Sequence, residues 1–276
     1  MKISVVIPSI GNRNLIPTLR SIVDSSIYVD EIIISIPDQV NVKKDRFKSF
    51  KNLIFLNSKV KGQVAQRIEG FKVAKNDVVV QLDDDIILER ECLKLMMAFI
   101  KKNNYSAVSA HFYDIANRES IYYNLNTNKY NFIKYIMNGS NAGINGIITR
   151  SGFETYPNFN CDKNVILSEW IPGGCVMHLK KNLVLSNFFP YTGKAYCEDL
   201  FHSIALKKNN IKLYYHTNAK AFLEIENIKS NFKIYIKHLR ADFQIRKKLV
   251  EQNKLSKSRM YLVYIIKTIS YFYKWY

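Results

Sequence analysis

The chain lacks the features that mark zinc-binding, secreted or membrane-spanning proteins. Its 276 residues include only four cysteines, and no two of them form a close pair such as C-x-x-C. This spacing indicates neither a zinc site nor a redox motif, and it fits a reducing cytosol best. No apolar run reaches the roughly 18 to 20 residues of a spanning helix, and the apolar N-terminal stretch is too short for a signal peptide. We expect a soluble or peripheral cytoplasmic protein.

Acidic residues are also scarce relative to basic ones. The chain has 41 Lys and Arg against 23 Asp and Glu, a formal net charge of +18. Such a surface attracts an anionic partner, whether a nucleotide, a phospholipid surface or a nucleic acid, and charge alone does not choose among them. The 47% of hydrophobic residues excludes a disordered chain. Because there is no internal repeat and no long linker, we expect one main domain with an appendage.

Strand-like and helix-like segments alternate in the N-terminal half, which predicts a doubly wound α/β sheet. The Val78-Val79-Val80 run indicates a strand buried on both faces, as in parallel sheets flanked by helices. Further on, Asn-, Tyr- and Gly-rich residues 114–152 have weak periodicity and are interpreted as loops and irregular strands. The predicted strands are Ile3–Pro8, Glu31–Ile36, Phe50–Leu56, Asn76–Leu82 and Ile211–Tyr215, and the predicted helices are Leu15–Ser25, Val64–Ala74 and Glu198–Lys208; Cys175–Leu179 is a further apolar segment.

The character of the sequence changes near its end, so we predict a main domain over residues 1–227 and a basic amphipathic helical segment over 228–276. One helical stripe there is apolar, and Lys and Arg residues surround it. The stripe consists of Phe232, Tyr235, Ile236, Leu239, Phe243 and Val250. The last residues, Met260 to Tyr276, mix aromatic side chains, including Trp275 and Tyr276, with Lys267 and Lys274.

Three adjacent carboxylates, Asp83, Asp84 and Asp85, follow a strand that the pattern places centrally in the sheet. Ligands of open parallel sheets bind at the carboxyl ends of the strands. Adjacent carboxylates repel one another unless a cation lies among them, and a diphosphate bound through Mg²⁺ or Mn²⁺ meets one or two protein carboxylates. The alternative is structural: Asp85 caps a helix running through Ile87 to Lys101.

The order of motifs over the first 85 residues resembles that of family 2 glycosyltransferases. Members open with a strand ending in Pro-Ser or Pro-Thr, followed by a turn with Arg or Asn. A helix with a Gly, a small residue and an Arg comes next. An Ala-x-x-Asp then precedes a strand, and the DXD motif follows that strand. Ser35-Ile36-Pro37 replaces the usual Val-Asp-Asp-Gly before Asp38. The matching residues here are Pro8-Ser9, Arg13, Gly62, Ala65, Arg67, Ala74, Asp77 and Asp83-Asp84-Asp85.

The resemblance implies a GT-A, Rossmann-like domain that binds a nucleotide-sugar and a divalent metal, Mn²⁺ or Mg²⁺. Many such enzymes supply a late His to the metal, and His216 is the candidate here, although a lone His is commonly structural. Arg67 can instead form a surface salt bridge, and Ser9 and Asp38 can be turn formers. The implied nucleotide-sugar ligands are Pro8, Ser9, Arg13, Asp38, Arg67, Asp83 and Asp84, and the implied metal ligands are Asp83, Asp85 and His216.

Inverting glycosyl transfer needs a base that takes the proton of the acceptor hydroxyl. In the resembling family this is a Glu-Asp pair at the start of a helix, and Glu198-Asp199 occupies that place, with Asp199 as the base. The alternative is an acidic first turn that only favours the helix dipole. The segment with Trp170, Gly173 and Gly174 resembles the loop facing acceptor and donor sugar, in which the aromatic ring offers a stacking surface.

Two other functions compete with glycosyl transfer. A nucleotidyltransferase acting on sugar phosphates would carry a Gly-rich basic loop near the N-terminus, which Ser9 to Arg13 only poorly approaches. A non-enzymatic polyanion-binding protein would fit the charge, but the chain has no recognisable nucleic-acid-binding motif. By resemblance, we expect a glycosyltransferase of lipopolysaccharide or capsule synthesis. It would use a glycan or lipid-linked acceptor and lie peripherally on the inner face of the cell membrane, held there by residues 228–276. The alternative is that the apolar stripe of this segment packs on the main domain or on a second subunit, with its charges solvated.

Overall fold

The protein forms two compact units. The computed structural model describes residues 1–40, 42–122, 131–140, 145–189, 191, 195–225 and 231–273. Unit 1 comprises Met1–Ile121 and Asp162–Glu224, and unit 2 comprises Tyr122–Cys161 and Ile225–Tyr276. The residues 122–161 thus group with the C-terminal segment, whereas the sequence predicted that they belong to the main domain.

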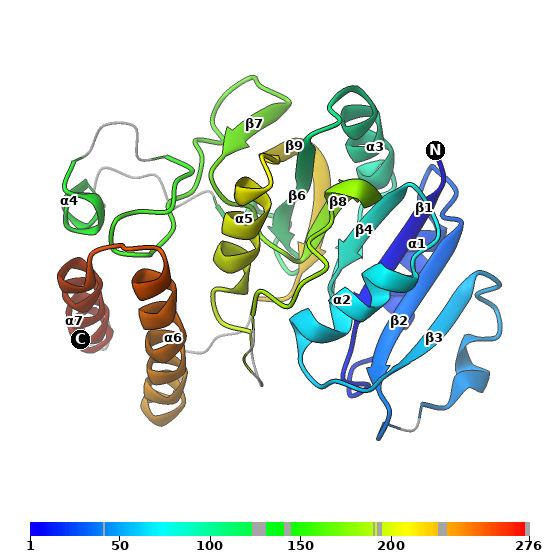
Figure 1. Ribbon diagram of the computed structural model, residues 1–276, viewed down its shortest axis with the longest axis horizontal. Coiled ribbons are helices and arrows are strands. Elements are labelled where there is room, and N and C mark those ends of the chain that lie inside the picture. The colour runs from blue at the N-terminus through cyan, green and yellow to red at the C-terminus, as the bar shows by residue number, and fades with distance from the viewer. Residues whose placement is uncertain are drawn as a thin grey trace. The chain divides into compact units, whose positions relative to one another are not determined.

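Unit 1 is built on one mixed sheet (Figure 1). Within the described residues it has nine strands, in the order β3-β2-β1-β4-β8-β6-β9-β5, and β7 also pairs with β9. The strands β1 to β4 are parallel to one another, while β8 runs antiparallel to both of its neighbours, β4 and β6. The strands are β1 (Ile3–Pro8), β2 (Glu31–Pro37), β3 (Leu53–Ser58), β4 (Val78–Leu82), β5 (Ile87–Leu88), β6 (Ser106–Asp114), β7 (Val165–Ser168), β8 (Cys175–Leu179) and β9 (Lys212–Leu223).

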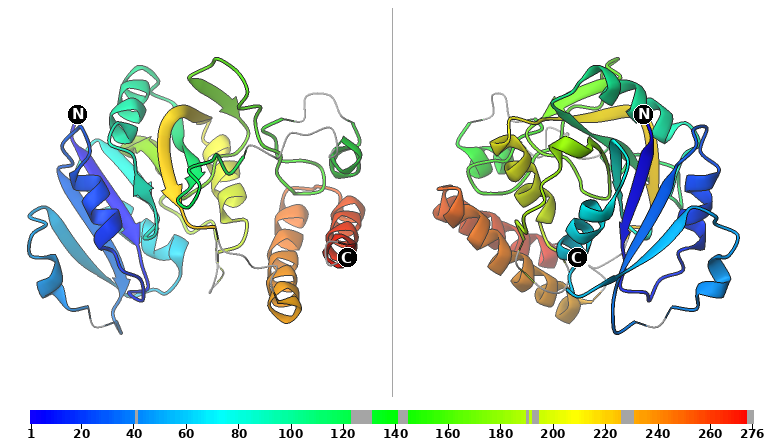
Figure 2. Two further views of the ribbon diagram at one scale, coloured as in Figure 1. Left: turned by 180° about the vertical axis from the view of Figure 1, so that it is seen from behind. Right: turned by 45° about the vertical axis from the view of Figure 1, so that its right-hand side comes forward.

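Helices cover both faces of this sheet. The helix α2 lies in front of the sheet in Figure 1, and α1 comes forward in the reverse view of Figure 2. Both faces are therefore buried, which explains the continuous apolar strands: every residue of β1, β2 and β4 is buried. The helices are α1 (Ile16–Val23), α2 (Gln63–Val73), α3 (Cys92–Lys102) and α5 (Glu198–Lys208), with short 3-10 turns η1 (Lys44–Phe47) and η4 (Lys180–Asn182).

A glycine sets the close packing of α2 on the sheet. A Cβ atom at Gly70 would lie 2.3 Å from Cγ1 of Val6 on β1. No side chain fits at that distance, so Gly70 lets the helix approach the strand directly. This approach fixes the position of the polar side chains at the start of α2, which belong to the candidate site.

Unit 2 is helical, and its core explains the apolar stripe of the C-terminal segment. It contains α4 (Asn131–Asn138), α6 (Phe232–Gln252) and α7 (Lys257–Tyr273). The helix α4 lies within residues 114–152, which were interpreted from the sequence as loops and irregular strands. Its short apolar spacing was not recognised as helical. Val250 is fully buried, Leu239 and Phe243 pack on the same core, and Tyr235 stacks on Tyr271 of α7. Most of the α6 stripe therefore packs inside unit 2, whereas Phe232 at its start is 45% exposed.

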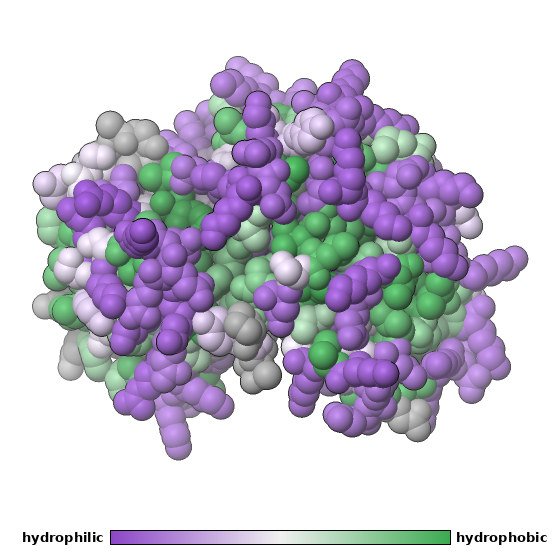
Figure 3. Space-filling model, viewed as in Figure 1, coloured by the Kyte–Doolittle hydropathy of each residue, from purple (hydrophilic) through white to green (hydrophobic). Residues whose placement is uncertain are grey.

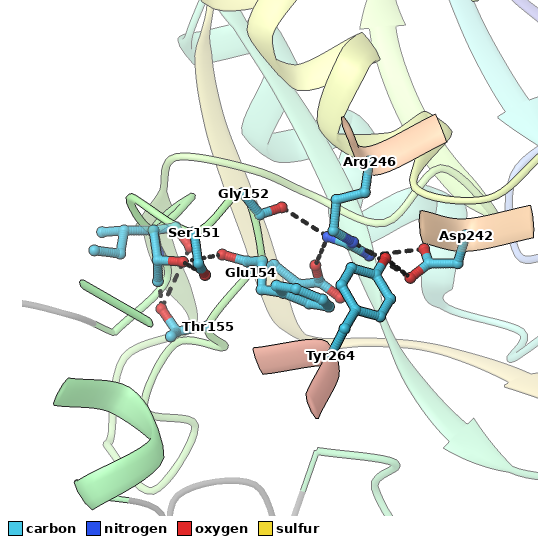
Figure 4. Close-up of polar contacts among 10 residues, drawn as sticks. Ser151, Gly152, Glu154, Thr155, Asp242, Arg246 and Tyr264 are labelled. Carbon is cyan, nitrogen blue, oxygen red and sulfur yellow. Dashed lines mark hydrogen bonds and ion pairs between the residues drawn. The ribbon is translucent and has the colours of Figure 1, made fainter. Parts of the chain in front are cut away.

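A buried arginine joins the two chain segments of unit 2 (Figure 4). Arg246 on α6 donates to the carbonyl oxygen of Gly152 at 2.7 Å and pairs with Glu154 at 3.1 Å and Asp242 at 3.1 Å. The hydroxyl of Tyr264 on α7 donates to Asp242 at 2.5 Å. Burial alone would raise the pKa of Asp242, but Arg246 and the Tyr264 hydroxyl lower it below its usual range.

Candidate functional site

The carboxyl ends of β1, β2 and β4 lie side by side at one edge of the sheet, because these strands are parallel neighbours. Ser9 follows β1, Asp38 follows β2, and Asp83 follows β4. The sequence placed these residues in the nucleotide site, and the topology brings their backbones to the same edge. Asp38 itself is exposed there, and its N–H donates to the carbonyl oxygen of Ser58 at 3.0 Å.

Asp84 and Asp85 are held by the turn that follows β1. The Ser9 hydroxyl donates to Asp84 at 2.6 Å, and Thr18 donates to the carbonyl oxygen of Asp84 at 3.2 Å. The Arg13 guanidinium lies 3.8 Å from Asp84 and forms a short ion pair with Asp85. Burial raises the pKa of Asp84, and the hydrogen bond from Ser9 opposes this shift.

These acids do not cap a helix. After Asp85 the chain forms the short strand β5, and α3 begins only at Cys92, with Glu91 as the residue before it. The capping alternative for Asp85 is therefore excluded by the position of the helix.

Arg67 lies between two carboxylate groups in the interior of unit 1. Its side chain is only 1% exposed. One guanidinium nitrogen donates to Asp83 at 3.0 Å and another donates to Glu198 at 2.9 Å. Arg67 is thus neither a solvated helix residue nor a surface salt bridge, and it joins the acids after β4 to those at the start of α5.

The same network shifts the pKa of Asp83. Burial raises it to about 6, and the nearby carboxylates of Glu198 and Asp85 act in the same direction. Arg67 opposes the shift, as does the side-chain amide of Gln63, which donates to Asp83 at 2.9 Å. The acids are therefore closely packed and mutually repelling, an arrangement that favours binding of a cation.

Two consecutive glycines link the two sets of acids. The N–H of Gly173 donates to Asp199 at 3.0 Å, and the carbonyl oxygen of Gly174 accepts from the N–H of Asp83 at 2.8 Å. A Cβ atom at Gly173 would lie 2.6 Å from both Asp199 Oδ1 and Glu198 Oε1. Only glycine lets the backbone approach the acids so closely.

The acids Glu198 and Asp199 form the first turn of α5. The residue before them, Cys197, has a left-handed backbone with φ of 44° and ψ of 25°, which is uncommon for a residue with a side chain. Burial raises the pKa of Asp199 well above its usual range, and the adjacent Glu198 adds to the shift. The acids do occupy the favourable end of the helix dipole, but their bonds to Arg67 and Gly173 go beyond that role.

Comparison with known proteins identifies the family. A sequence model described as "Glycosyl transferase family 2" matches residues 4–155, more than half of the chain. The chain belongs to glycosyl transferase family 2. This is the family that the order of motifs in the sequence predicted. A search among curated proteins finds no matching sequence.

Solved structures show that this family 2 glycosyltransferase has the GT-A fold. It is similar to a crystal structure of GalNAc-T7 with UDP, GalNAc and Mn²⁺, with a TM-score of 0.61 and 15% identity over 82% of this chain and 43% of the other. S. aureus TarS matches with a TM-score of 0.52 and 12% identity over 88% and 39% of the two chains. The structure of TarS residues 1–349 matches with a TM-score of 0.55 and 11% identity, over 96% of this chain and 69% of the other. The enzyme thus spans less than half of the first two proteins.

Three predicted site residues lie apart from the acids or are covered. Trp170 is buried, with its ring edge-on to that of Tyr215, so it offers no exposed stacking surface. His216 lies on β9, and three strand spacings, roughly 14 Å, separate β9 from β4. The structure therefore does not bring His216 to the aspartates. Pro8 is buried at the end of β1 and pairs with Ser35 of β2.

Sequence reasoning missed three glutamines that support the site. Gln63 binds Asp83, and Gln81 donates to the carbonyl oxygen of Gly173. Gln66 is fully buried and donates to the carbonyl oxygens of Ser9 at 2.9 Å and Ser35 at 2.8 Å, joining the ends of β1 and β2. One face of α2 carries Gln63, Gln66 and Arg67. Three polar residues at this helical spacing, in a helix with apolar residues, could have indicated from the sequence that this face belongs to the site.

The acids suit a divalent metal bound together with a diphosphate. No group of three His, Cys, Asp or Glu side chains in the described ranges is assembled as a metal site. A metal that takes phosphate and water oxygens needs only one or two carboxylates. The Asp85 carboxylate is 41% exposed and is held by a surface ion pair with Arg13, an interaction of low energy that a metal can displace.

Proposed function

We propose that this enzyme moves a sugar from a nucleoside-diphosphate donor to an acceptor hydroxyl with inversion at the anomeric carbon. The observation that carries the proposal is the link between the two acid groups. Asp83 and the Glu198-Asp199 pair are joined through Arg67 and through the Gly173-Gly174 turn. One group would face the leaving diphosphate and the other the acceptor, as an in-line displacement requires.

The donor side would use the edge formed by β1, β2 and β4. Asp83 and Asp85 would hold the metal, which when bound would neutralise charge on the diphosphate. Ser9, Arg13 and Asp84 would shape the nucleotide side, and exposed Asp38 would contact the nucleoside. The UDP and Mn²⁺ named in the GalNAc-T7 structure support a nucleotide-sugar donor and a divalent metal for this fold.

The acceptor side would use Asp199 as the base. Its carboxylate would take the proton of the acceptor hydroxyl while the hydroxyl oxygen bonds to the anomeric carbon and the bond from that carbon to the diphosphate breaks. The N–H of Gly173 orients this carboxylate, and Glu198, fixed by Arg67, would orient Asp199 or hold the acceptor. The raised pKa of Asp199 is consistent with a carboxylate that accepts a proton.

The acceptor would be a glycan or a lipid-linked sugar of a cell-surface polysaccharide such as lipopolysaccharide or capsule. The positive charge of +18 supports an anionic surface as the place of work. The enzyme would then act peripherally on the cytoplasmic face of the membrane. None of the described helices is long and apolar enough to cross a bilayer.

Calorimetry tests the donor site directly. The full chain should bind UDP, GDP or dTDP more tightly with Mn²⁺ than with a chelator, and Asp85→Ala should remove that metal-dependent gain. The matched control is Asp45→Ala, which changes an exposed acid on η1 that pairs with the neighbouring Lys48. Metal-dependent affinity that survives in Asp85→Ala would contradict the assignment of Asp85.

A further inference from the structure

The helix α7 has two apolar faces, and unit 2 buries only one of them. On the other face, the ring of Phe272 contacts that of Phe232 on α6, with ring centroids 5.3 Å apart. Met260, Val263, Tyr264 and Tyr271 are buried in the core of the unit. Leu262, Ile265, Ile269 and Phe272 recur at spacings of three, four and three residues, so they form a second stripe on another side of the helix. We call these four residues the outer stripe.

The outer stripe is exposed over its whole length. Its four side chains are about half exposed, from 48% for Leu262 to 54% for Ile265. The stripe is roughly 15 Å long, given the rise of a helix. A helix that is apolar on opposite sides is normally buried on both, so the outer stripe calls for an occupant.

The charge of unit 2 indicates which occupant fits. Unit 2 contains fifteen Lys and Arg against four Asp and Glu, a net charge of +11 of the chain's +18. Its described acids are all engaged with cations of the same unit: Glu154 and Asp242 with Arg246, and Glu251 with Lys257. Unit 2 therefore keeps a large positive net charge after these pairs form.

Much of this charge is displayed on α6. Lys233, Lys237, Arg240, Gln244 and Lys248 recur at helical spacing and are all exposed, so this face presents four cations and no acid. The space-filling view shows hydrophilic side chains mixed with hydrophobic ones over the surface (Figure 3). Unit 2 thus combines an exposed apolar stripe with a basic helix face, and both features favour binding to anionic lipid.

A second copy of the chain is the weaker candidate. Two units that each carry +11 repel one another, and the stripe spans fewer than two heptads, whereas coiled coils need three or four. Four side chains are also far fewer than the 20 to 30 residues a side of a stable protein interface. Nucleic acid fits the charge but leaves the apolar stripe without a partner.

We infer that the outer stripe of α7 inserts at the headgroup level of an anionic bilayer, with the helix lying in the plane of the membrane. This inference deepens the proposed work at a membrane and rests on it. It assigns membrane contact to a different face from the α6 stripe, most of which packs inside unit 2. The cations of unit 2 attract the protein to the anionic leaflet, and the outer stripe holds it there.

Sedimentation with vesicles tests the inference on the full chain. Wild-type protein should pellet with vesicles that contain phosphatidylglycerol at low salt and far less with phosphatidylcholine alone. The double variant Ile265→Gln/Ile269→Gln should lower the partition coefficient about tenfold or more, since two large apolar groups no longer leave water. Gln is a good helix former and both positions are exposed, so the fold should persist.

Two further variants separate the contributions. Lys237→Gln/Arg240→Gln should weaken binding several-fold and flatten its salt dependence. The matched control Ile54→Gln, an exposed apolar residue on β3 of unit 1, should bind as the wild type does. Wild type that stays in the supernatant, or an Ile265→Gln/Ile269→Gln variant that binds like wild type, overturns the inference.

Analytical ultracentrifugation and donor hydrolysis complete the test. A wild-type dimer that becomes monomeric in the Ile265→Gln/Ile269→Gln variant would assign the stripe to a second copy and overturn the membrane occupant. Nucleotide release from a soluble donor should be unchanged in this variant. If wild-type protein released no nucleotide yet bound anionic vesicles, the glycosyl-transfer proposal would fail while the docking surface stood.

Discussion

Arg67 is the residue on which both acid groups depend. Three carboxyl groups, those of Asp83, Glu198 and Asp199, lie around its single buried cation. Removing the cation would leave buried carboxylates without compensation, which is costly. In the proposed function, Arg67 would therefore position the donor side and the base at once.

Arg67→Lys should show this double dependence. Lysine keeps the charge but not the planar fork that reaches Asp83 and Glu198 together. We expect turnover to fall about 10²-fold, because a displacement of about 1 Å has that effect, and metal-dependent donor affinity to fall as well. The control is Arg20→Lys on the exposed side of α1. A variant with lowered thermal stability but normal kcat and KM would limit Arg67 to a structural role.

Asp199→Asn should separate binding from chemistry. The amide cannot take the acceptor proton, so turnover should fall by about 10² to 10⁴ while donor affinity by calorimetry stays near normal. Near-normal turnover in this variant would reject Asp199 as the base.

Gly173→Ala should be more harmful than the same change one residue later. The added methyl would lie 2.6 Å from Asp199 and Glu198, whereas at Gly174 its nearest atom is Phe112 Cζ at 3.3 Å. We expect a fall in kcat of about 10²-fold for Gly173→Ala and a much smaller one for Gly174→Ala. Equal effects on the two kcat values would show that the contact with the acids is not what matters.

At the scale of elements, the ion pairs and hydrogen bonds of Arg246 hold α6 against the 149–155 segment of unit 2. The folded-state pKa of Asp242 is lowered, so the stabilisation is present above the unfolded pKa of about 3.9 and is lost as the pH falls through the lower folded value.

Asp242→Asn should therefore lower the melting temperature at pH 7, and the gap to wild type should narrow below about pH 4. Circular dichroism at a series of pH values measures this gap. The control Glu251→Gln breaks an exposed pair with Lys257 and should change little. A gap for Asp242→Asn that stays constant from pH 7 to pH 3 would show that ionisation of Asp242 is not its source.

The elements show where sequence reasoning succeeds and where it fails. Strand β1 and helix α5 were predicted to the residue, because apolar runs and helical spacing report local structure directly. The partner of the α6 stripe was not predicted. It lies on α7 and within residues 131–155, and pairing between distant segments leaves no periodic signal in either one.

The site shows the same limit. Asp83 to Asp85 and Glu198-Asp199 were found from their motifs, but the burial of Arg67 and Trp170 was not. Both depend on how α2 and the 170–174 segment pack in three dimensions. The position of His216 relative to β4 depends on the strand order, which chain order does not reveal. The predicted Lys274, Trp275 and Tyr276 of the membrane segment lie outside the described residues.

At the scale of the whole molecule, the two units divide the proposed tasks. Unit 1 carries the acids and the family 2 match covers most of its N-terminal part, while unit 2 carries most of the net charge and the outer stripe. Activity toward a soluble donor should therefore be independent of vesicles, and activity toward a lipid-linked acceptor should rise when anionic vesicles are present. The Ile265→Gln/Ile269→Gln variant should lose only the second effect.

Nucleotide release from a panel of nucleotide-sugars tests the central claim most directly. The full chain, incubated with Mn²⁺ and UDP-, GDP- or dTDP-sugars, should release the nucleoside diphosphate from at least one donor. Release should stop with a chelator and fall by about 10²-fold or more in Asp199→Asn. Release of pyrophosphate from a nucleoside triphosphate in the presence of a sugar phosphate, with formation of the nucleotide-sugar, would instead indicate a nucleotidyltransferase. No metal-dependent release from any donor, with or without a lipid-linked acceptor, would contradict glycosyl transfer by this protein.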